Sequence, residues 1–195
     1  MSAARQPAMP PAHPFDFDAI RASGDEDKLK EECGVFGVIG LSDAANFVAL
    51  GLHALQHRGQ EAGGIVAYHP EHGFNSARRF GYVRDNFTKQ SLMETLPGPL
   101  SIGHVRYSTA GASTLRNAQP ICATTDGGPV AIAHNGNLVN AAPIRRALEG
   151  RGAIFGSTSD SEVILHLLAR SREETLEDRF IDALSRVKGA FSVVM

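Results

Sequence analysis

The sequence predicts an α+β fold or a layered sandwich rather than a doubly wound α/β fold. Apart from one helical stretch, short apolar runs with strand-like alternation dominate the chain up to residue 134, and after it the apolar period becomes helical, at about 3.6 residues. Several glycine-bearing loops separate the elements. Strands that come first and helices that gather later are typical of α+β proteins.

The expected strands are short and bounded by turn residues. The run CGVFGVIG is apolar and glycine-spaced, as in a buried strand. Two later pairs flank turns, at 71–73 and at 126–128. The strands are expected at 33–40, 63–69, 77–83, 100–105, 121–125, 129–134 and 189–195.

Four helices are expected. The first has Ser42 as a plausible N-cap, and its expected packed face carries Phe47, Leu50, Ala54 and Leu55. The third has a capping box, in which Ser159 and Glu162 would satisfy each other's backbone N–H groups. The helices are expected at 44–56, 140–149, 160–171 and 175–187.

The chain of 195 residues suits one globular domain with an appendage. Residues 1–32 are rich in proline and alanine and then acidic, with four basic and seven acidic side chains, so we expect a largely disordered leader. Residues 33–195 form the expected domain. Its closing run, GAFSVVM, would leave an apolar strand unpaired, so we interpret the chain as a fragment of a longer protein.

Composition excludes several function classes. A net charge of -2 gives no reason to expect nucleic acid or an anionic membrane as a partner. No apolar run approaches the ~20 residues of a membrane span. The two cysteines form no C-x-x-C pair, and no histidine spacing indicates a metal site, so we expect no metal. A reducing cytoplasm is the expected compartment.

Cys33 is the candidate nucleophile. A lone cysteine is more often a small buried core residue. However, this one stands at the first position of the expected domain, directly after the leader. Cleavage between Glu32 and Cys33 would place an α-amino group of pKa near ~8 beside the thiol, where it could act as a general base. The leader would then act as an off switch.

Four other features could contribute to a substrate site. Asn135-Gly136 predicts a tight turn that could present an amide side chain and a backbone N–H to an oxyanion, although a structural turn is its commoner use. Arg106 could grip a carboxylate, or be a solvated loop cation. Asp160 could hold an ammonium group, or simply favour a helix start. Arg58 could equally be a cation at a helix end.

Six motifs in order resemble class II glutamine amidotransferases, a family of N-terminal-nucleophile hydrolases. The resemblance covers 33–195 almost continuously. The leader and GHVRYSTAG are similar to the amidophosphoribosyltransferase family rather than to glucosamine-6-phosphate synthase. The six motifs are CGVFGV, LQHRGQEAGGI, IGHVRYSTAG, NAQP, AHNGNLVN and TSDSE.

The resemblance implies a role for each site residue. Cys33 would attack the carboxamide of glutamine, and its α-amino group would move the proton. The implied oxyanion donors are Asn135 and the N–H of Gly136. Arg106 would bind the α-carboxylate and Asp160 the α-amino group. The remaining implied residues are Arg58, which braces the nucleophile, and Tyr107 and Thr109, which line the site.

The resemblance also implies a fold and partners. The fold would be a four-layer αββα sandwich. A second domain, absent here, would use the ammonia to convert phosphoribosyl pyrophosphate to 5-phosphoribosylamine, the first step of purine synthesis. That domain would need Mg²⁺ and, in some members, an iron–sulfur cluster, while this stretch needs no cofactor. Full-length members would be homo-oligomers. The alternatives are a glutaminase for another acceptor and a non-catalytic fragment.

Overall fold

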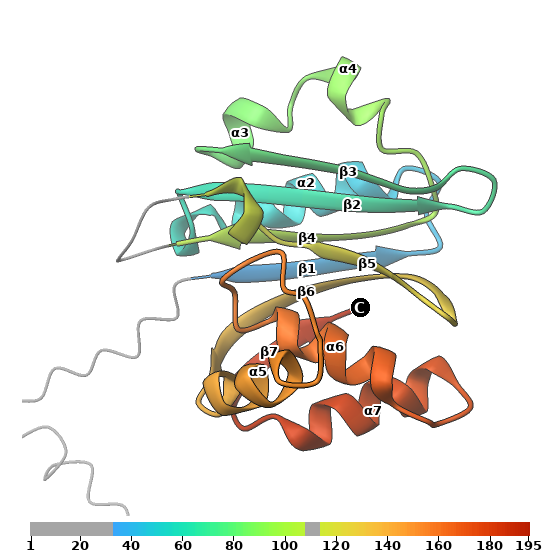
Figure 1. Ribbon diagram of the computed structural model, residues 1–195. Helices are drawn as coiled ribbons and strands as arrows, with labels where there is room; N and C mark the ends of the chain where they lie inside the picture. Colours follow the sequence, from blue (N-terminus) through green and yellow to red (C-terminus); the bar gives the residue numbers. More distant parts are fainter. Residues whose placement is uncertain (1–32, 108–113) are drawn as a thin grey trace, which may run out of the picture. The chain divides into compact units, whose positions relative to one another are not determined.

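The computed structural model describes residues 33–107 and 114–195 (Figure 1). The predicted α+β class is confirmed: the described residues form two antiparallel sheets with helices. The first sheet has the order β1-β4-β2-β3 and the second β5-β6-β7. The leader, 1–32, lies outside the described residues.

The elements agree with most of the expected ranges. Every expected strand and helix is present, with boundaries shifted by a few residues. The strands are β1 (Gly34–Ile39), β2 (Ala62–His69), β3 (Gly73–Phe80), β4 (Leu100–Arg106), β5 (Ile121–Thr125), β6 (Gly128–Leu138) and β7 (Gly189–Val194). The helices are α2 (Ala44–Ala54), α3 (Val83–Asn86), α4 (Gln90–Met93), α5 (Ala141–Glu149), α6 (Glu162–Arg170) and α7 (Leu176–Arg186), with short 3₁₀ turns η1 (Gln56–Arg58) and η2 (Leu115–Asn117).

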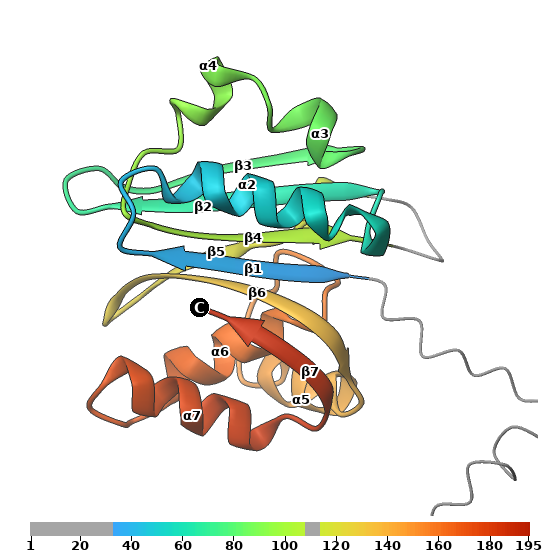
Figure 2. The same ribbon diagram turned by 180° about the vertical axis from the view of Figure 1, so that it is seen from behind.

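Helix α2 packs on one face of the first sheet (Figure 2). Its buried face carries Val48 and Leu52, which approach β4 at Gly103. A side chain at Gly103 could not fit, because its Cβ would lie 2.5 Å from Val48 Cγ1. The packed face predicted for this helix is wrong for three of its four residues, because Phe47 is 47% exposed, Leu50 is 65% exposed and Ala54 is exposed as well. Only Leu55 packs against the core between α2 and the sheet. The helix is apolar on several sides, so its sequence period alone did not select the buried face.

Alternation along β6 places its side chains in two different cores. Val130 and Ile132 pack among α5, α6 and α7. Ala131 and Ala133 face the first sheet and pack in the cluster that contains Val66 of β2. Successive side chains of a strand point to opposite faces, so one strand can be buried on both. The two sheets therefore pack face to face, with α2 beyond the first and α5–α7 beyond the second (Figures 1 and 2).

The predicted helix starts are partly wrong. Asp43, not Ser42, is the N-cap residue of α2, and its side chain makes no capping hydrogen bond. No capping box forms at α6 either, because Ser161 is its N-cap residue. The carboxylate of Glu162 instead accepts hydrogen bonds from the backbone N–H groups of Gly156 and Ser157, at 2.7 and 2.8 Å. It thus fixes the preceding loop rather than the helix end.

Within the described residues no helix is long and apolar enough to cross a membrane.

We predict that Ile164→Ala lowers the free energy of unfolding by ~2–5 kcal/mol, because Ile164 of α6 is fully buried in the core around β6 and the change leaves a cavity there. Chemical denaturation measures the loss. The matched control is Ile181→Ala on α7, where the side chain is 64% exposed. Equal losses in the two variants would contradict this packing.

Candidate active site

A cavity of about 360 Å³ lies where β1 begins and β4 ends, beside β6 and the loop before α6. Five of the predicted site residues line it: Cys33, Arg106, Tyr107, Gly136 and Asp160. They come from four separate segments of the chain. The volume is within the range of small-molecule sites, ~300–1,000 Å³.

Cys33 directly precedes β1 and is half-buried. Gly34 pairs with Val105 in the antiparallel register, which brings Cys33 next to the end of β4. Its thiol lies 3.9 Å from the carbonyl oxygen of Tyr107. Arg58 donates from Nε to the Cys33 carbonyl oxygen at 2.9 Å. Arg58 therefore holds the main chain at Cys33 from the outside, although it does not line the cavity.

Arg106 is the last residue of β4. Its Nε lies 3.6 Å from Glu61 Oε2, and both side chains are mostly buried. The Glu61 backbone N–H also donates to the Arg106 carbonyl oxygen, at 3.1 Å. The guanidinium is thus fixed from the β2 side while it lines the cavity. Thr109 lies outside the described residues.

The tight turn predicted at Asn135 and Gly136 is wrong, because both residues lie inside β6. They pair with Ser192 and Phe191 of β7. Gly136 has φ +138°, and a Cβ there would lie 2.3 Å from the Ala190 carbonyl oxygen. Asn-Gly commonly forms a turn, but pairing with a distant strand decides the conformation here. Gly136 lines the cavity; Asn135, half-buried beside it, is not among the lining residues.

Asp160 lies in the loop before α6 rather than in its first turn. Its Oδ2 accepts a hydrogen bond from the backbone N–H of Leu138 at 3.0 Å. Its Oδ1 lies 3.5 Å from the Ser161 hydroxyl and 3.9 Å from His134 Nδ1. The carboxylate is therefore tied to the end of β6. Its side chain is about one third exposed, at the cavity.

Two buried histidines, for which the sequence indicates no role, also line the cavity. His104 is 1% exposed and His134 3%. The pKa of His104 is lowered to about 3, chiefly by burial and to a smaller extent by the nearby His134 and Arg106, while a backbone contact with His134 opposes the shift. Burial also lowers the pKa of His134, although Asp160 opposes the shift. Both rings are therefore neutral near pH 7, so the charges at the cavity come from Arg106 and Asp160.

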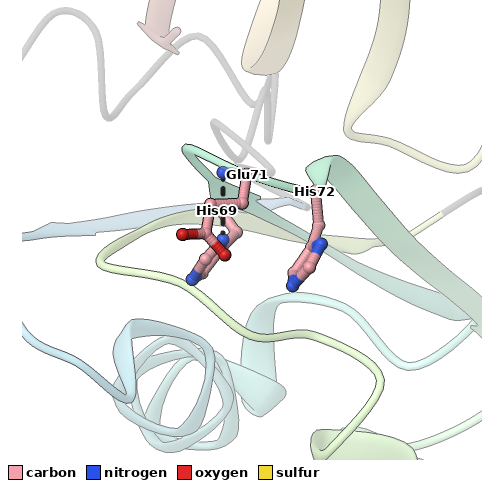
Figure 3. Close-up of side chains that lie close together, drawn as sticks. All are labelled: His69, Glu71 and His72. Carbon is pink, nitrogen blue, oxygen red and sulfur yellow. Dashed lines mark hydrogen bonds between the residues drawn. The ribbon is translucent and has the colours of Figure 1, made fainter.

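Only one group within the described ranges could hold a metal ion, and it lies elsewhere (Figure 3). His69, Glu71 and His72 meet at the turn between β2 and β3, with their ligand atoms within 4.8 Å of one another. At the other end of β2, Ala62 pairs with Arg106 of the cavity. The Glu71 backbone N–H donates to His69 Nδ1 at 3.1 Å, so that nitrogen is already engaged. This exposed group is separate from the candidate active site.

A larger cavity, of about 700 Å³, lies between α2 and the α3–α4 segment. It contains no cysteine and none of the predicted site residues. The smaller cavity, which brings a thiol, a guanidinium and a carboxylate together, is therefore the candidate active site.

The histidine at the cavity leads to a pH prediction. In the unfolded chain His104 binds a proton near pH 6.5, whereas in the folded protein it does so only near pH 3. The unfolded state therefore binds more protons between these values, and stability falls as pH falls, by up to about 1.4 kcal/mol per pH unit. We predict a shallower decline for His104→Gln than for the parent between pH 6.5 and 4.5, measured by chemical denaturation. Parallel profiles would contradict a neutral, buried His104.

Comparison with known proteins identifies the family. A glutamine amidotransferase domain model matches residues 104–195. The amidophosphoribosyltransferase of Rhizobium etli is 52% identical over 87% of this chain and 34% of its own length. That of Lacticaseibacillus casei is 46% identical over 86% of both sequences.

Two solved structures agree. One, described as the allosteric regulatory enzyme of purine biosynthesis, has a TM-score of 0.76 and 41% identity, over 82% of this chain and 34% of that one. The glutamine phosphoribosylpyrophosphate amidotransferase of Bacillus subtilis, complexed with ADP and GMP, has a TM-score of 0.73 and 40% identity over the same shares. The chain spans about a third of the length of most of these relatives. By its sequence and its fold, the chain belongs to the amidophosphoribosyltransferase family, of which it contains the glutamine amidotransferase region.

Proposed function

We propose that this region hydrolyses glutamine to glutamate and ammonia, with Cys33 as the nucleophile. The observation that carries the proposal is the meeting of Cys33, Arg106 and Asp160 at one cavity. A guanidinium fits an α-carboxylate, and a carboxylate fits an α-ammonium group. The two opposite charges beside a thiol therefore suit an α-amino acid whose side chain reaches the sulfur.

The reaction requires the peptide bond before Cys33 to be cut. The nitrogen of Cys33 then becomes an amine that can take the thiol proton, which an amide nitrogen cannot do. The thiolate attacks the carboxamide carbon, and the proton passes to the leaving nitrogen, which departs as ammonia. Water hydrolyses the resulting thioester to glutamate and restores the thiol.

The oxyanion formed in each step needs hydrogen-bond donors. We assign this role to the Asn135 side chain and the Gly136 backbone N–H, which are adjacent on β6. Arg58 would steady the nucleophile through the Cys33 carbonyl, and Tyr107 and Thr109 would line the substrate. The layered arrangement supports assignment to the αββα sandwich of the N-terminal-nucleophile hydrolases.

We further propose that a longer protein containing this region passes the ammonia to phosphoribosyl pyrophosphate and forms 5-phosphoribosylamine. The relatives' names support this acceptor over an amino sugar. Mg²⁺, any iron–sulfur cluster and the contacts of a homo-oligomer would belong to the part beyond this chain. The cytoplasm is the compartment we propose, although the Arabidopsis relatives are named as chloroplastic.

We predict that protein beginning at Cys33 releases glutamate from glutamine and that Cys33→Ala abolishes the release. Intact-mass analysis establishes where the purified chain begins, and an enzymatic glutamate assay measures the rate. The matched control is Cys122→Ala, because Cys122 is exposed on β5 and outside the cavity. Glutamate release by the Cys33 variant, or none by correctly cut parent protein, would refute the proposed function.

For Arg106→Ala we predict a raised KM for glutamine, by ~10- to 100-fold, with a smaller change in kcat. A clamp on the α-carboxylate acts on substrate and transition state alike, so its loss mainly weakens binding. Steady-state glutamate release over a range of glutamine concentrations measures both constants. Arg84→Ala is the control, because that side chain is 63% exposed and outside the cavity. A lower kcat at constant KM would contradict the clamp.

A further inference from the structure

The NAQP segment, residues 117–120, is one of the six motifs of the family resemblance. It begins at the last residue of the 3₁₀ turn η2 and leads into β5. Two of its side chains are amides, and Asn117 and Gln119 both line the candidate active site. Gln119 is only 7% exposed. A buried amide must find partners for both of its ends, so its contacts show what it holds.

Gln119 holds the main chain of β6 at His134. Its Oε1 accepts a hydrogen bond from the His134 backbone N–H at 2.7 Å. Its Nε2 donates to the His134 carbonyl oxygen at 3.2 Å and to the Ser161 hydroxyl at 3.1 Å. An amide nitrogen has two hydrogens, so both donors are used. The side chain thus binds both backbone groups of the residue directly before Asn135.

The segment itself is fixed from the side of the first sheet. Arg78 of β3 donates from Nε and Nη2 to the Pro120 carbonyl oxygen, at 3.1 and 2.7 Å. Gly64 of β2 lies against Gln119, and a Cβ there would lie 2.1 Å from the Gln119 carbonyl oxygen. The first sheet therefore holds the segment in place, and Gln119 transmits that position to the second sheet.

Asn117 makes a similar contact with the loop that carries Asp160. Its Nδ2 donates to the Thr158 hydroxyl at 2.9 Å, and its Oδ1 accepts from the Thr158 backbone N–H at 3.1 Å. The two amides, two positions apart, thus hold different parts of the site. Gln119 holds the strand of the proposed oxyanion donors, and Asn117 holds the loop of the proposed ammonium anchor.

We propose that Gln119 is a positioning residue, which sets the place of Asn135 and Gly136 by holding the main chain at His134. The inference rests on the proposed glutaminase function. An oxyanion exists only near the transition state, so misplaced donors lower kcat more than they raise KM. Asp160 would bind substrate and transition state alike, so loosening its loop through Asn117 raises KM instead.

The test compares Gln119→Met with Asn117→Ala in protein that begins at Cys33. We expect Gln119→Met to lower kcat by ~10- to 100-fold with a much smaller change in KM. We expect Asn117→Ala mainly to raise KM. Calorimetry confirms that each variant is folded, and Gln90→Met, at an exposed residue of α4, is the matched control. A kcat for folded Gln119→Met equal to that of the parent would overturn the inference, whether or not KM is raised.

Gln119→Glu provides a second variant that keeps the side-chain shape. Its carboxylate can still accept from the His134 N–H but can donate to neither oxygen. Protonation restores one donor, so we expect its kcat, relative to the parent at the same pH, to recover as pH falls. A merely structural loss would not follow this pH profile. A ratio that is constant with pH and equal to one would contradict the role of Gln119.

Backbone hydrogen exchange separates this inference from the proposed function. We expect faster exchange across residues 134–138 in Gln119→Met than in the parent, because the His134 N–H loses its acceptor. If exchange is faster in the variant but the correctly cut parent is inactive, the contact between Gln119 and the His134 main chain is supported and the glutaminase function is refuted. Unchanged exchange would overturn the inference whether or not the parent is active.

Discussion

The burial of β6 on both faces is the constraint on which the rest of this structure depends. Its even-numbered core residues pack against the helices, and its small odd-numbered residues allow the first sheet to come close. A larger side chain at Ala131 or Ala133 would separate the sheets, since interiors of this kind are close-packed. The cavity lies where the two sheets meet, with Cys33 and the end of β4 contributing one wall and the end of β6 the other. Sheet packing therefore sets the distance between the thiol and its proposed oxyanion donors.

The sequence predicted the elements well because their periods are strong and local. Strand alternation and the change to a helical period after residue 134 located nearly every strand and helix. The failures have tertiary causes. The buried face of α2 was selected by the close approach at Gly103. Asn135 and Gly136 became strand because they pair with Ser192 and Phe191, which follow much later in the chain. The carboxylate of Glu162 accepts hydrogen bonds from backbone N–H groups of the preceding loop, which the sequence pattern of a helix start does not predict.

The chemistry of the residue types and the order of the motifs predicted the reactive and charged residues of the candidate site. Cys33, Arg106, Tyr107, Gly136 and Asp160 were named from sequence and line one cavity. The buried residues behind them were not predictable in the same way. His104, His134 and Gln119 lie within three of the six motifs, but their residue types alone indicate no role for them. Their importance depends on burial and on contacts across long separations, such as that between Gln119 and His134, which no local pattern records.

The pairing of Gly136 with β7 has a consequence for folding during synthesis on the ribosome. About fifty residues separate the end of β6 from the start of β7, and three helices are made between them. Until β7 has been synthesised, Gly136 lacks its partner in the sheet, Phe191. Contacts of such long sequence separation form late in folding, because closing the intervening loop costs entropy before the contacts reward it. A nascent chain therefore carries its cysteine for some time before it has the surroundings that would make the thiol useful.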